Sequence, residues 1–199
     1  MINEIIQREW NFFQEVNNIG GPAQCQRDNE TFVLQRTAQF ESFDEEVLES
    51  YLQDLKDYQN TPYNPLANKY AYMMRSTDPE YFKTIEDQLP QLDDAQKDLI
   101  EIIVAIEVTM REKLNEKYPT LSLLSRYTYT SQDTKEDTSF ETYLRGELST
   151  YSPHTLYLYG KMIMNKMNNN INFILEILER TVKAYGYSSI EEANAKHSV

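Results

Sequence analysis

The chain has 199 residues, a single cysteine and a formal net charge of −13. That length is typical of one folded domain, and one cysteine excludes an intramolecular disulfide. The 19 basic residues are scattered, so a surface that binds nucleic acid or an anionic membrane is not expected. No apolar run approaches the roughly 20 residues of a membrane span, and the start shows no signal-peptide pattern. We therefore expect a cytoplasmic protein with one helical domain over residues 1–199.

Helical periodicity dominates the chain, because apolar residues recur every three and four positions in each long segment. The longest helix is predicted over about 94–118, where Pro119 closes it. The glycine pair at 20–21 is expected to end the first helix. Other helices are predicted over about 2–16, 28–42, 47–58, 153–168, 171–185 and a short stretch opened by Ser188. The predicted fold class is all-α, with roughly eight to ten helices joined by short loops.

Four helix starts have a local signature. Asn64-Pro65, Asp78-Pro79 and Ser152-Pro153 each place a capping side chain directly before a proline. The cap satisfies free backbone N–H groups, and proline fits the first helical position because it has no N–H to leave unpaired. Thr138 and Glu141 have the spacing of a capping box, which predicts a helix that begins there.

Residues 119–137 interrupt the helical pattern. Their apolar side chains alternate loosely with Ser and Thr, at Leu121, Leu123, Leu124, Tyr127 and Tyr129. One short strand or hairpin is compatible with this pattern, but it favours an ordered loop packed by its own apolar residues. Loops of this length without regular structure are uncommon and often functional.

The densest polar segment lies between the first two helices, at residues 17–28. It holds Asn17, Asn18, Cys25 and Gln26 together with two glycines. Polar groups at such a junction either cap the helix ends or line a site. A reactive thiolate needs a helix N-terminus, a cation or a histidine beside it, and no histidine is near Cys25 in the sequence. We therefore interpret Cys25 as a small buried apolar residue, with a nucleophile as the alternative.

An arginine on an apolar face marks the second helix. Phe32, Arg36, Gln39 and Phe40 fall on one side, which is expected to turn inward. A buried guanidinium requires a carboxylate or an anionic ligand. The alternative is that the stem of Arg36 packs while its charged end reaches water.

A matching carboxylate is available in the helix predicted after residue 138. Tyr143 and Glu147 share a face there with two apolar residues, and Glu141 lies one turn and a half earlier. We predict that Arg36 is buried and ion-paired with Glu141 or Glu147.

Metal and cofactor sites are not indicated. The chain has only two histidines, and zinc or di-iron sites on helices draw on several His or Cys ligands. Glycine-rich phosphate loops, dinucleotide fingerprints and nucleophile elbows are also absent from the sequence. We expect no cofactor and no metal.

Several segments resemble the bacterial and archaeal family called domain of unknown function 4125, over nearly the whole chain. They are Glu9-Trp10-x-x-Phe13 through Cys25-Gln26, Thr31-Phe32, Arg36-x-x-Gln39-Phe40, Leu48 through Lys56, and Asp137 through Ser152. The resemblance implies a fold and no activity. It also implies a glycine-rich segment ending in histidine before Ser131, whereas residues 121–130 contain neither glycine nor histidine.

The leading functional hypothesis is a small-molecule or peptide binding domain, with a polar site between residues 17–28 and 138–151. Its candidate ligand-binding residues are Asn17, Asn18, Cys25, Gln26, Arg36, Gln39, Glu141, Tyr143 and Glu147. The alternative is an acidic accessory subunit that docks a partner enzyme. An enzyme of unknown reaction is the third possibility, with Cys25, Arg36 and Glu141 as candidates. An open pocket at Arg36 favours the first hypothesis, and an exposed apolar patch with those charges paired internally favours the second.

Overall fold

The computed structural model describes residues 1–17 and 24–197, without the side chains of residues 24 and 25. Within that part of the chain it contains eleven α-helices and no strand. The helices are α1 (Ile2–Gln14), α2 (Asn29–Phe40), α3 (Glu45–Tyr58), α4 (Pro65–Thr77), α5 (Pro79–Ile85), α6 (Asp94–Lys117), α7 (Pro119–Leu123), α8 (Phe140–Leu148), α9 (Pro153–Asn168), α10 (Phe173–Ala184) and α11 (Ile190–Lys196). Short 3-10 turns are η1 (Gln24–Arg27), η2 (Glu86–Gln88) and η3 (Thr130–Gln132). The all-α prediction is confirmed.

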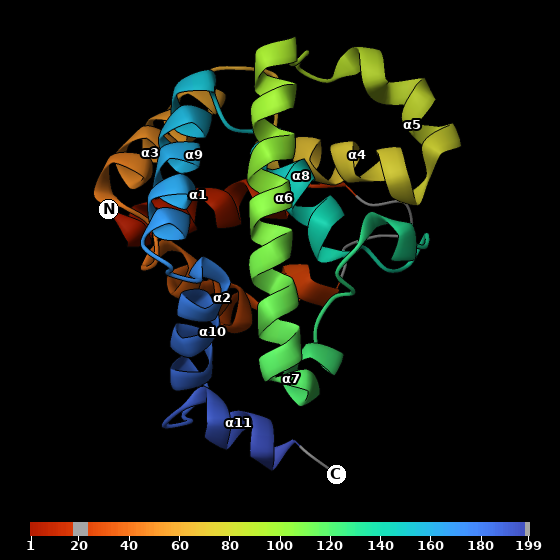
Figure 1. Cartoon of the computed structure of the whole chain (residues 1–199). Helices are drawn as coiled ribbons and strands as arrows, with labels where there is room; N and C mark the ends of the chain where they lie inside the picture. Colours follow the sequence, from red (N-terminus) through yellow and green to blue (C-terminus); the bar gives the residue numbers. More distant parts are fainter. Residues whose placement is uncertain (18–23, 198–199) are drawn as a thin grey trace.

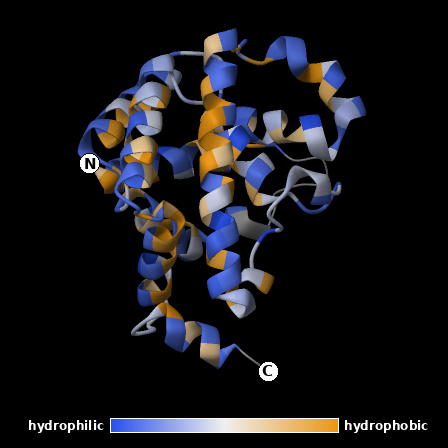
Figure 2. Cartoon of the chain, in the orientation of Figure 1, coloured by the Kyte–Doolittle hydropathy of each residue, from blue (hydrophilic) through white to orange (hydrophobic). Residues whose placement is uncertain are grey.

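The long helix α6 is the centre of the arrangement (Figure 1). It packs against α8, α9 and α10, while α4 packs on α8 from the other side. The N-terminal helix α1 contacts α2, α3 and α4. Orange and blue segments alternate along most helices in Figure 2, as expected for helices with one apolar face.

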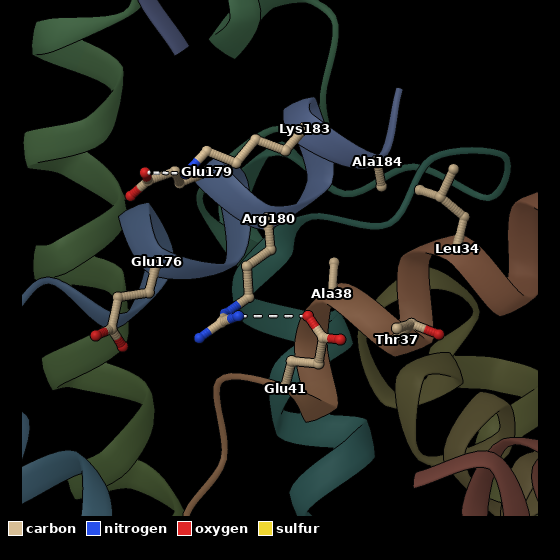
Figure 3. A pocket seen from close by; sticks show the side chains of 9 residues that line it. All are labelled: Leu34, Thr37, Ala38, Glu41, Glu176, Glu179, Arg180, Lys183 and Ala184. Atoms are coloured by element: carbon tan, nitrogen blue, oxygen red, sulfur yellow. Dashed lines mark hydrogen bonds and ion pairs between the residues drawn. The ribbon is translucent and has the colours of Figure 1, made fainter. Parts of the chain in front are cut away.

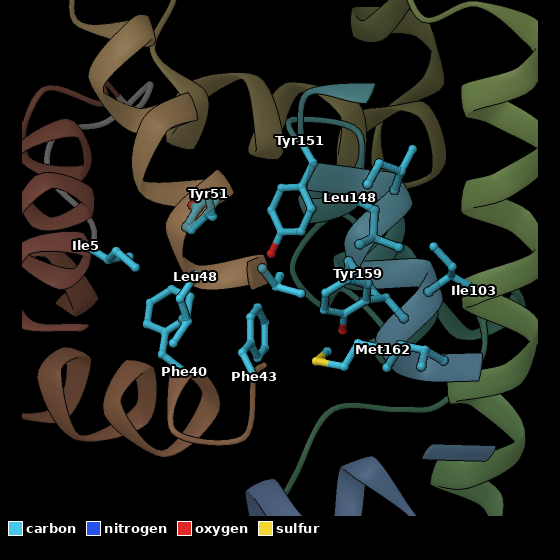
Figure 4. Packing of buried hydrophobic residues seen from close by; sticks show 14 of the residues in the cluster. Ile5, Phe40, Phe43, Leu48, Tyr51, Ile103, Leu148, Tyr151, Tyr159 and Met162 are labelled. Carbon is cyan, nitrogen blue, oxygen red and sulfur yellow. The ribbon is translucent and has the colours of Figure 1, made fainter. Parts of the chain in front are cut away.

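One large apolar cluster joins most of the helices. Its aromatic centre consists of Phe40, Phe43, Tyr51, Tyr151 and Tyr159, and neighbouring rings of this set pack against each other (Figure 4). Burying side chains of this size is the main term that holds the helices together.

A smaller cluster attaches the C-terminal helix. Tyr118, Val182, Ile190 and Ala193 are buried together where α11 meets α7 and α10. The hydroxyl of Tyr118 also donates to the carboxylate of Glu191 at 2.5 Å. In the part of the chain that the structure describes, no helix is both long and apolar enough to cross a bilayer.

The helix starts before proline are confirmed. The side chains of Asn64, Asp78 and Ser152 each accept a hydrogen bond from a backbone N–H in the following turn, and proline occupies the first helical position. The predicted bounds of α6 and α9 also match closely, and Asp28 caps α2.

We expect that replacing Asp78 by alanine lowers the free energy of unfolding by about 1 kcal/mol, because the N–H of Tyr81 loses its acceptor. Urea unfolding measures this change. Asp78→Asn is the matched control, because it keeps a capping oxygen but removes the exposed ion pair with Lys135, which contributes little. Equal losses in both variants would show that the ion pair matters rather than the cap.

Two predicted starts are wrong by one residue. Ser139, and not Thr138, caps α8 by accepting from the N–H of Thr142. Ser189 caps α11 in the same way, one residue after the predicted Ser188. The carboxylate of Glu141 is unable to close a capping box because it accepts from the N–H of Thr130 instead. The glycine pair predicted to end α1 lies outside the described residues, and α1 itself ends at Gln14.

The prediction for residues 119–137 is wrong in one respect. Pro119 ends α6 but also begins the short helix α7, and η3 follows, so the segment is ordered without a strand. Most of its apolar side chains face the solvent, however. Leu123, Leu124, Tyr127 and Tyr129 are exposed, whereas Thr128 between them is buried. Hydrogen bonds hold the loop in place instead. In one of them, the side-chain amide of Asn115 donates to the Thr128 hydroxyl at 2.9 Å.

Candidate functional site

Four charged side chains meet inside the helical bundle. They are Glu9 from α1, Arg36 from α2, Lys69 from α4 and Glu147 from α8, and each is less than a tenth exposed. We call them the buried charge cluster. Two cations and two carboxylates balance one another, which reduces the cost of removing them from water.

Arg36 links the two carboxylates of the cluster. Its Nε donates to Glu9 Oε2 at 2.7 Å, its Nη2 donates to the other oxygen of Glu9, and its Nη1 donates to Glu147 Oε1 at 3.1 Å. Lys69 Nζ completes the cluster by donating to Glu147 Oε2 at 2.5 Å. The predicted pairing of Arg36 with Glu147 is therefore confirmed, and Glu141 is not its partner.

Neutral side chains complete the hydrogen bonding of the cluster. Gln39 Oε1 accepts from Arg36 at 2.6 Å, and Gln39 Nε2 donates to Glu147 at 3.1 Å. The hydroxyl of Tyr51 donates to Glu9 at 2.7 Å, and Figure 4 shows Tyr51 beside Tyr151 in the apolar core. Every member therefore has partners within the fold, which is the condition for a buried ionic group to be tolerated.

The pairing in the cluster shifts the pKa values of Glu147 and Arg36 toward their charged forms. Burial by itself raises the pKa of Glu147, but the positive charges of Arg36 and Lys69 outweigh this effect and lower that pKa to about 2. Burial lowers the pKa of Arg36, but Glu147 and Glu9 raise it well above its usual value. At neutral pH Arg36 and Glu147 are therefore an ionised, mutually bonded pair, which is an arrangement typical of a structural role rather than of proton transfer.

The remaining residues of the predicted site that the structure describes lie in different places. Gln26 is buried and donates to the carbonyl oxygens of Phe13 and Val16 at the end of α1. Its place is therefore that of a helix cap, one of the two roles expected for the junction. Asn17 is exposed. Asn18 and the side chain of Cys25 lie outside the described part of the structure.

Glu141 lies on another side of α8, whereas Tyr143 contacts the cluster member Lys69. Glu141 pairs with Arg145 at 2.9 Å and lines an outer cleft. Tyr143 lies between two cations, because Lys69 Nζ is 3.6 Å and the guanidinium carbon of Arg126 is 4.6 Å from its ring centroid. Such contacts stabilise cations against an aromatic face.

Sequence reasoning missed the other buried ionisable groups. Glu9 and Lys69 belong to the cluster, and Glu107 of α6 is buried with its carboxylate 2.8 Å from the hydroxyl of Tyr159. Burial raises the pKa of Glu107 to about 8. A signal was present for both glutamates, since each follows apolar residues at three and four positions on its helix, as Arg36 does.

Three of the surface hollows lie between helices of the bundle. The groove between α2 and α10, of about 570 Å³, exposes ion pairs such as Glu41 with Arg180 and Glu179 with Lys183 (Figure 3). The groove between α3 and α9, of about 670 Å³, is lined mainly by carboxylates and His154. A cleft of about 430 Å³ lies between α4, α6 and α8. None of the three is lined by Arg36 or Glu147, so the buried charge cluster does not open into any of them.

Exposed apolar side chains lie on α7 and on the loop that follows it, beside the last turns of α6. The surface that they form consists of Leu123, Leu124, Tyr127 and Tyr129, and we call it the 123–129 surface. Among the residues that the structure describes, no group of three or more His, Cys, Asp or Glu side chains is arranged to hold a metal ion.

The fold and the site together define the class of this protein. It is an all-helical domain built around a buried, internally paired charge cluster. The chain belongs to the family described as Protein of unknown function (DUF4125), whose family model matches residues 1–195. The family resemblance is thereby confirmed. Searches among curated proteins and among solved structures gave no match.

Proposed function

We propose that this protein is an interaction domain that docks a partner protein through the 123–129 surface. The observation that carries the proposal is the exposure of four large apolar side chains within seven residues. Leu123 is 86% exposed, Leu124 66%, Tyr127 57% and Tyr129 42%. Isolated exposed apolar side chains are ordinary, but a contiguous group of them marks an interaction site in many soluble proteins.

The rest of the described surface supports this choice. Fourteen large apolar side chains are exposed among the described residues, and the other ten lie elsewhere between Met1 and Tyr185. The next densest group among them, Met164, Met167 and Ile171, is at most 40% exposed. The binding-site hypothesis requires charged side chains that a ligand can reach, but Arg36 and Glu147 are instead bonded to each other. The accessory-subunit alternative from the sequence is therefore the better supported of the two.

Two arginines indicate the chemistry of the partner. Arg126 lies within the 123–129 surface, and its Nη1 donates to the carbonyl of Thr138 at 3.0 Å. Arg111 of α6 reaches the same loop through Ser125 and the carbonyl of Arg126. Neither arginine has an ion pair with a carboxylate among the described residues, although the chain carries 32 acidic residues. A partner segment with apolar side chains and a carboxylate would complement both features.

A second copy of this chain and an anionic bilayer are less suitable partners. Both carry large negative charge, and this chain already has a net charge of −13. Four side chains also cover only a few hundred Å², less than the roughly 800 Å² per partner of a standard stable interface. A short partner segment fits that area better. The cytoplasm stays the proposed compartment, in keeping with the single cysteine.

The proposal is tested by cross-linking followed by reconstitution. A photoreactive amino acid placed at position 124 in cells of the source organism should form an adduct with one discrete protein, which is identified and purified. Calorimetry then compares its affinity for the wild type and for the double variant Leu123→Ser, Leu124→Ser. We expect at least about a tenfold loss of affinity, because the central apolar contacts of an interface dominate its energy.

The matched control is Met164→Ser, Met167→Ser, which removes two exposed apolar side chains from α9. It should bind the partner as the wild type does. An adduct that forms equally well from position 164, or equal affinity of both double variants, would contradict the proposal. Melting curves confirm that each variant is folded.

A further inference from the structure

The cleft between α4, α6 and α8 has the features of a small-molecule site. Its volume of about 430 Å³ lies in the range of roughly 300–1,000 Å³ that ligand sites occupy. One wall is the face of α4 with Tyr72, Arg75 and Ser76, and the other is the face of α8 with Glu141 and Arg145. The side chain of Glu101 from α6 closes the third side.

The two long walls are rigidly joined. A Cβ atom at Gly146 would lie 2.7 Å from Met73 Cγ and 2.9 Å from the carbonyl oxygen of Lys69, so α4 and α8 touch at this position. Directly behind it, Lys69 bonds to Glu147 in the buried charge cluster. The cluster therefore fixes the spacing of the walls, which is the preorganisation that a binding site needs.

Most of the polar lining is already occupied by internal bonds. Arg145 donates to both oxygens of Glu101, at 2.7 and 3.0 Å, and to Glu141 at 2.9 Å. This pairing neutralises one positive and one negative charge and leaves a second carboxylate in excess. The Tyr72 hydroxyl donates to the carbonyl of Pro90 at 2.5 Å.

Arg75 is different. Its guanidinium carbon lies 5.1 Å from the ring centroid of Phe82, and it has no ion pair with any residue that the structure describes. The cleft thus presents one cation without a carboxylate partner on the α4 side. On the α6 and α8 side, two carboxylates share one arginine. The lining also includes the apolar side chain of Leu92.

From this distribution of charge we propose that the cleft binds a small zwitterion of the amino-acid type. Its carboxylate would pair with Arg75, and its ammonium group would lie against the excess negative charge of Glu101 and Glu141. A doubly charged phosphate fits less well, because the cleft offers only one cation that is free to pair with it. This site is separate from the 123–129 surface and does not depend on the interaction proposed there.

The test is a calorimetric titration of the full chain with the standard free amino acids. For the tightest of them, expected to bind with a Kd of about 1 mM or lower, two derivatives are compared. The N-acetyl form lacks the cation, and the amide form lacks the carboxylate. Each should bind at least about tenfold more weakly, because each leaves one charged side of the cleft unpaired. Inorganic phosphate is the probe for a simple anion site.

Two variants locate the binding in the cleft. Arg75→Gln should lower the affinity for the tightest-binding amino acid by about tenfold or more. Arg180→Gln, in the groove between α2 and α10, removes an exposed arginine elsewhere and should leave binding unchanged. The proposal is overturned if no free amino acid binds with a Kd below about 10 mM, if phosphate or either derivative binds as tightly, or if Arg75→Gln has no effect.

Discussion

Replacing Arg36 by methionine is expected to lower the free energy of unfolding by about 3–5 kcal/mol. Methionine fills a similar volume but leaves Glu9 and Glu147 without the guanidinium that bonds to both. A buried carboxylate without its partner is far more costly than an intact pair, because water no longer solvates it. Guanidinium chloride unfolding at pH 7 measures the loss.

The pH dependence gives the same prediction a second readout. The pKa of Glu147 is about 2 in the folded chain and 4.5 in the unfolded chain. The pairing of Glu147 therefore adds stability above pH 4.5, and this stability is lost as the pH falls toward 2. The difference in free energy of unfolding between the wild type and Arg36→Met should therefore become smaller below pH 4.5. Arg180→Met removes an exposed pair with Glu41 and should cost less than about 1 kcal/mol. A similar cost at both arginines would contradict the proposed role of the cluster.

Replacing Glu107 by glutamine is expected to stabilise the protein at alkaline pH, by about 5 kcal/mol at pH 9. Burial raises the pKa of Glu107 from 4.5 to about 8, so folding favours the protonated form. The wild type has its full stability from this group below pH 4.5 and loses it as the pH rises through 8. Glutamine stays neutral and keeps an oxygen that accepts from the hydroxyl of Tyr159.

Urea unfolding of both proteins between pH 4 and pH 9 separates this effect from all other titrations, because only the difference between the two curves is used. The curves should meet near pH 4 and diverge with rising pH. Glu116→Gln, an exposed glutamate on the same helix, should leave the pH profile unchanged. Parallel curves for the wild type and Glu107→Gln would show that Glu107 is ionised in the folded chain at neutral pH.

Helix positions followed from the sequence because their causes are local. The caps at Asn64, Asp78 and Ser152 act on backbone groups within the next turn, so residues a few positions apart are sufficient to predict them. The errors at Thr138 and Ser188 arose where two candidate caps are adjacent in the sequence. Only the bond from the N–H of Thr142 to the Ser139 hydroxyl shows which residue caps α8.

The pairing of Arg36 with Glu147 was also predictable, because each charge lies on the apolar face of its own helix. The remaining members of the cluster were not predicted. Glu9 had the same signal on α1, but Lys69 becomes buried only because α4 packs against α8 through Gly146. The choice among carboxylates depended on which faces of α8 turn inward.

The sequence by itself therefore determined the helical class, most helix bounds and the presence of a buried ion pair, all through interactions within one helix or one apolar face. The tertiary structure decided what is open to the solvent. Leu123 and Leu124 look like packing residues in the sequence, yet both are exposed. Arg75 has no sequence signal and becomes a candidate ligand contact only because α4, α6 and α8 enclose a cleft. Exposure and enclosure depend on where distant segments pack, and local patterns do not encode that.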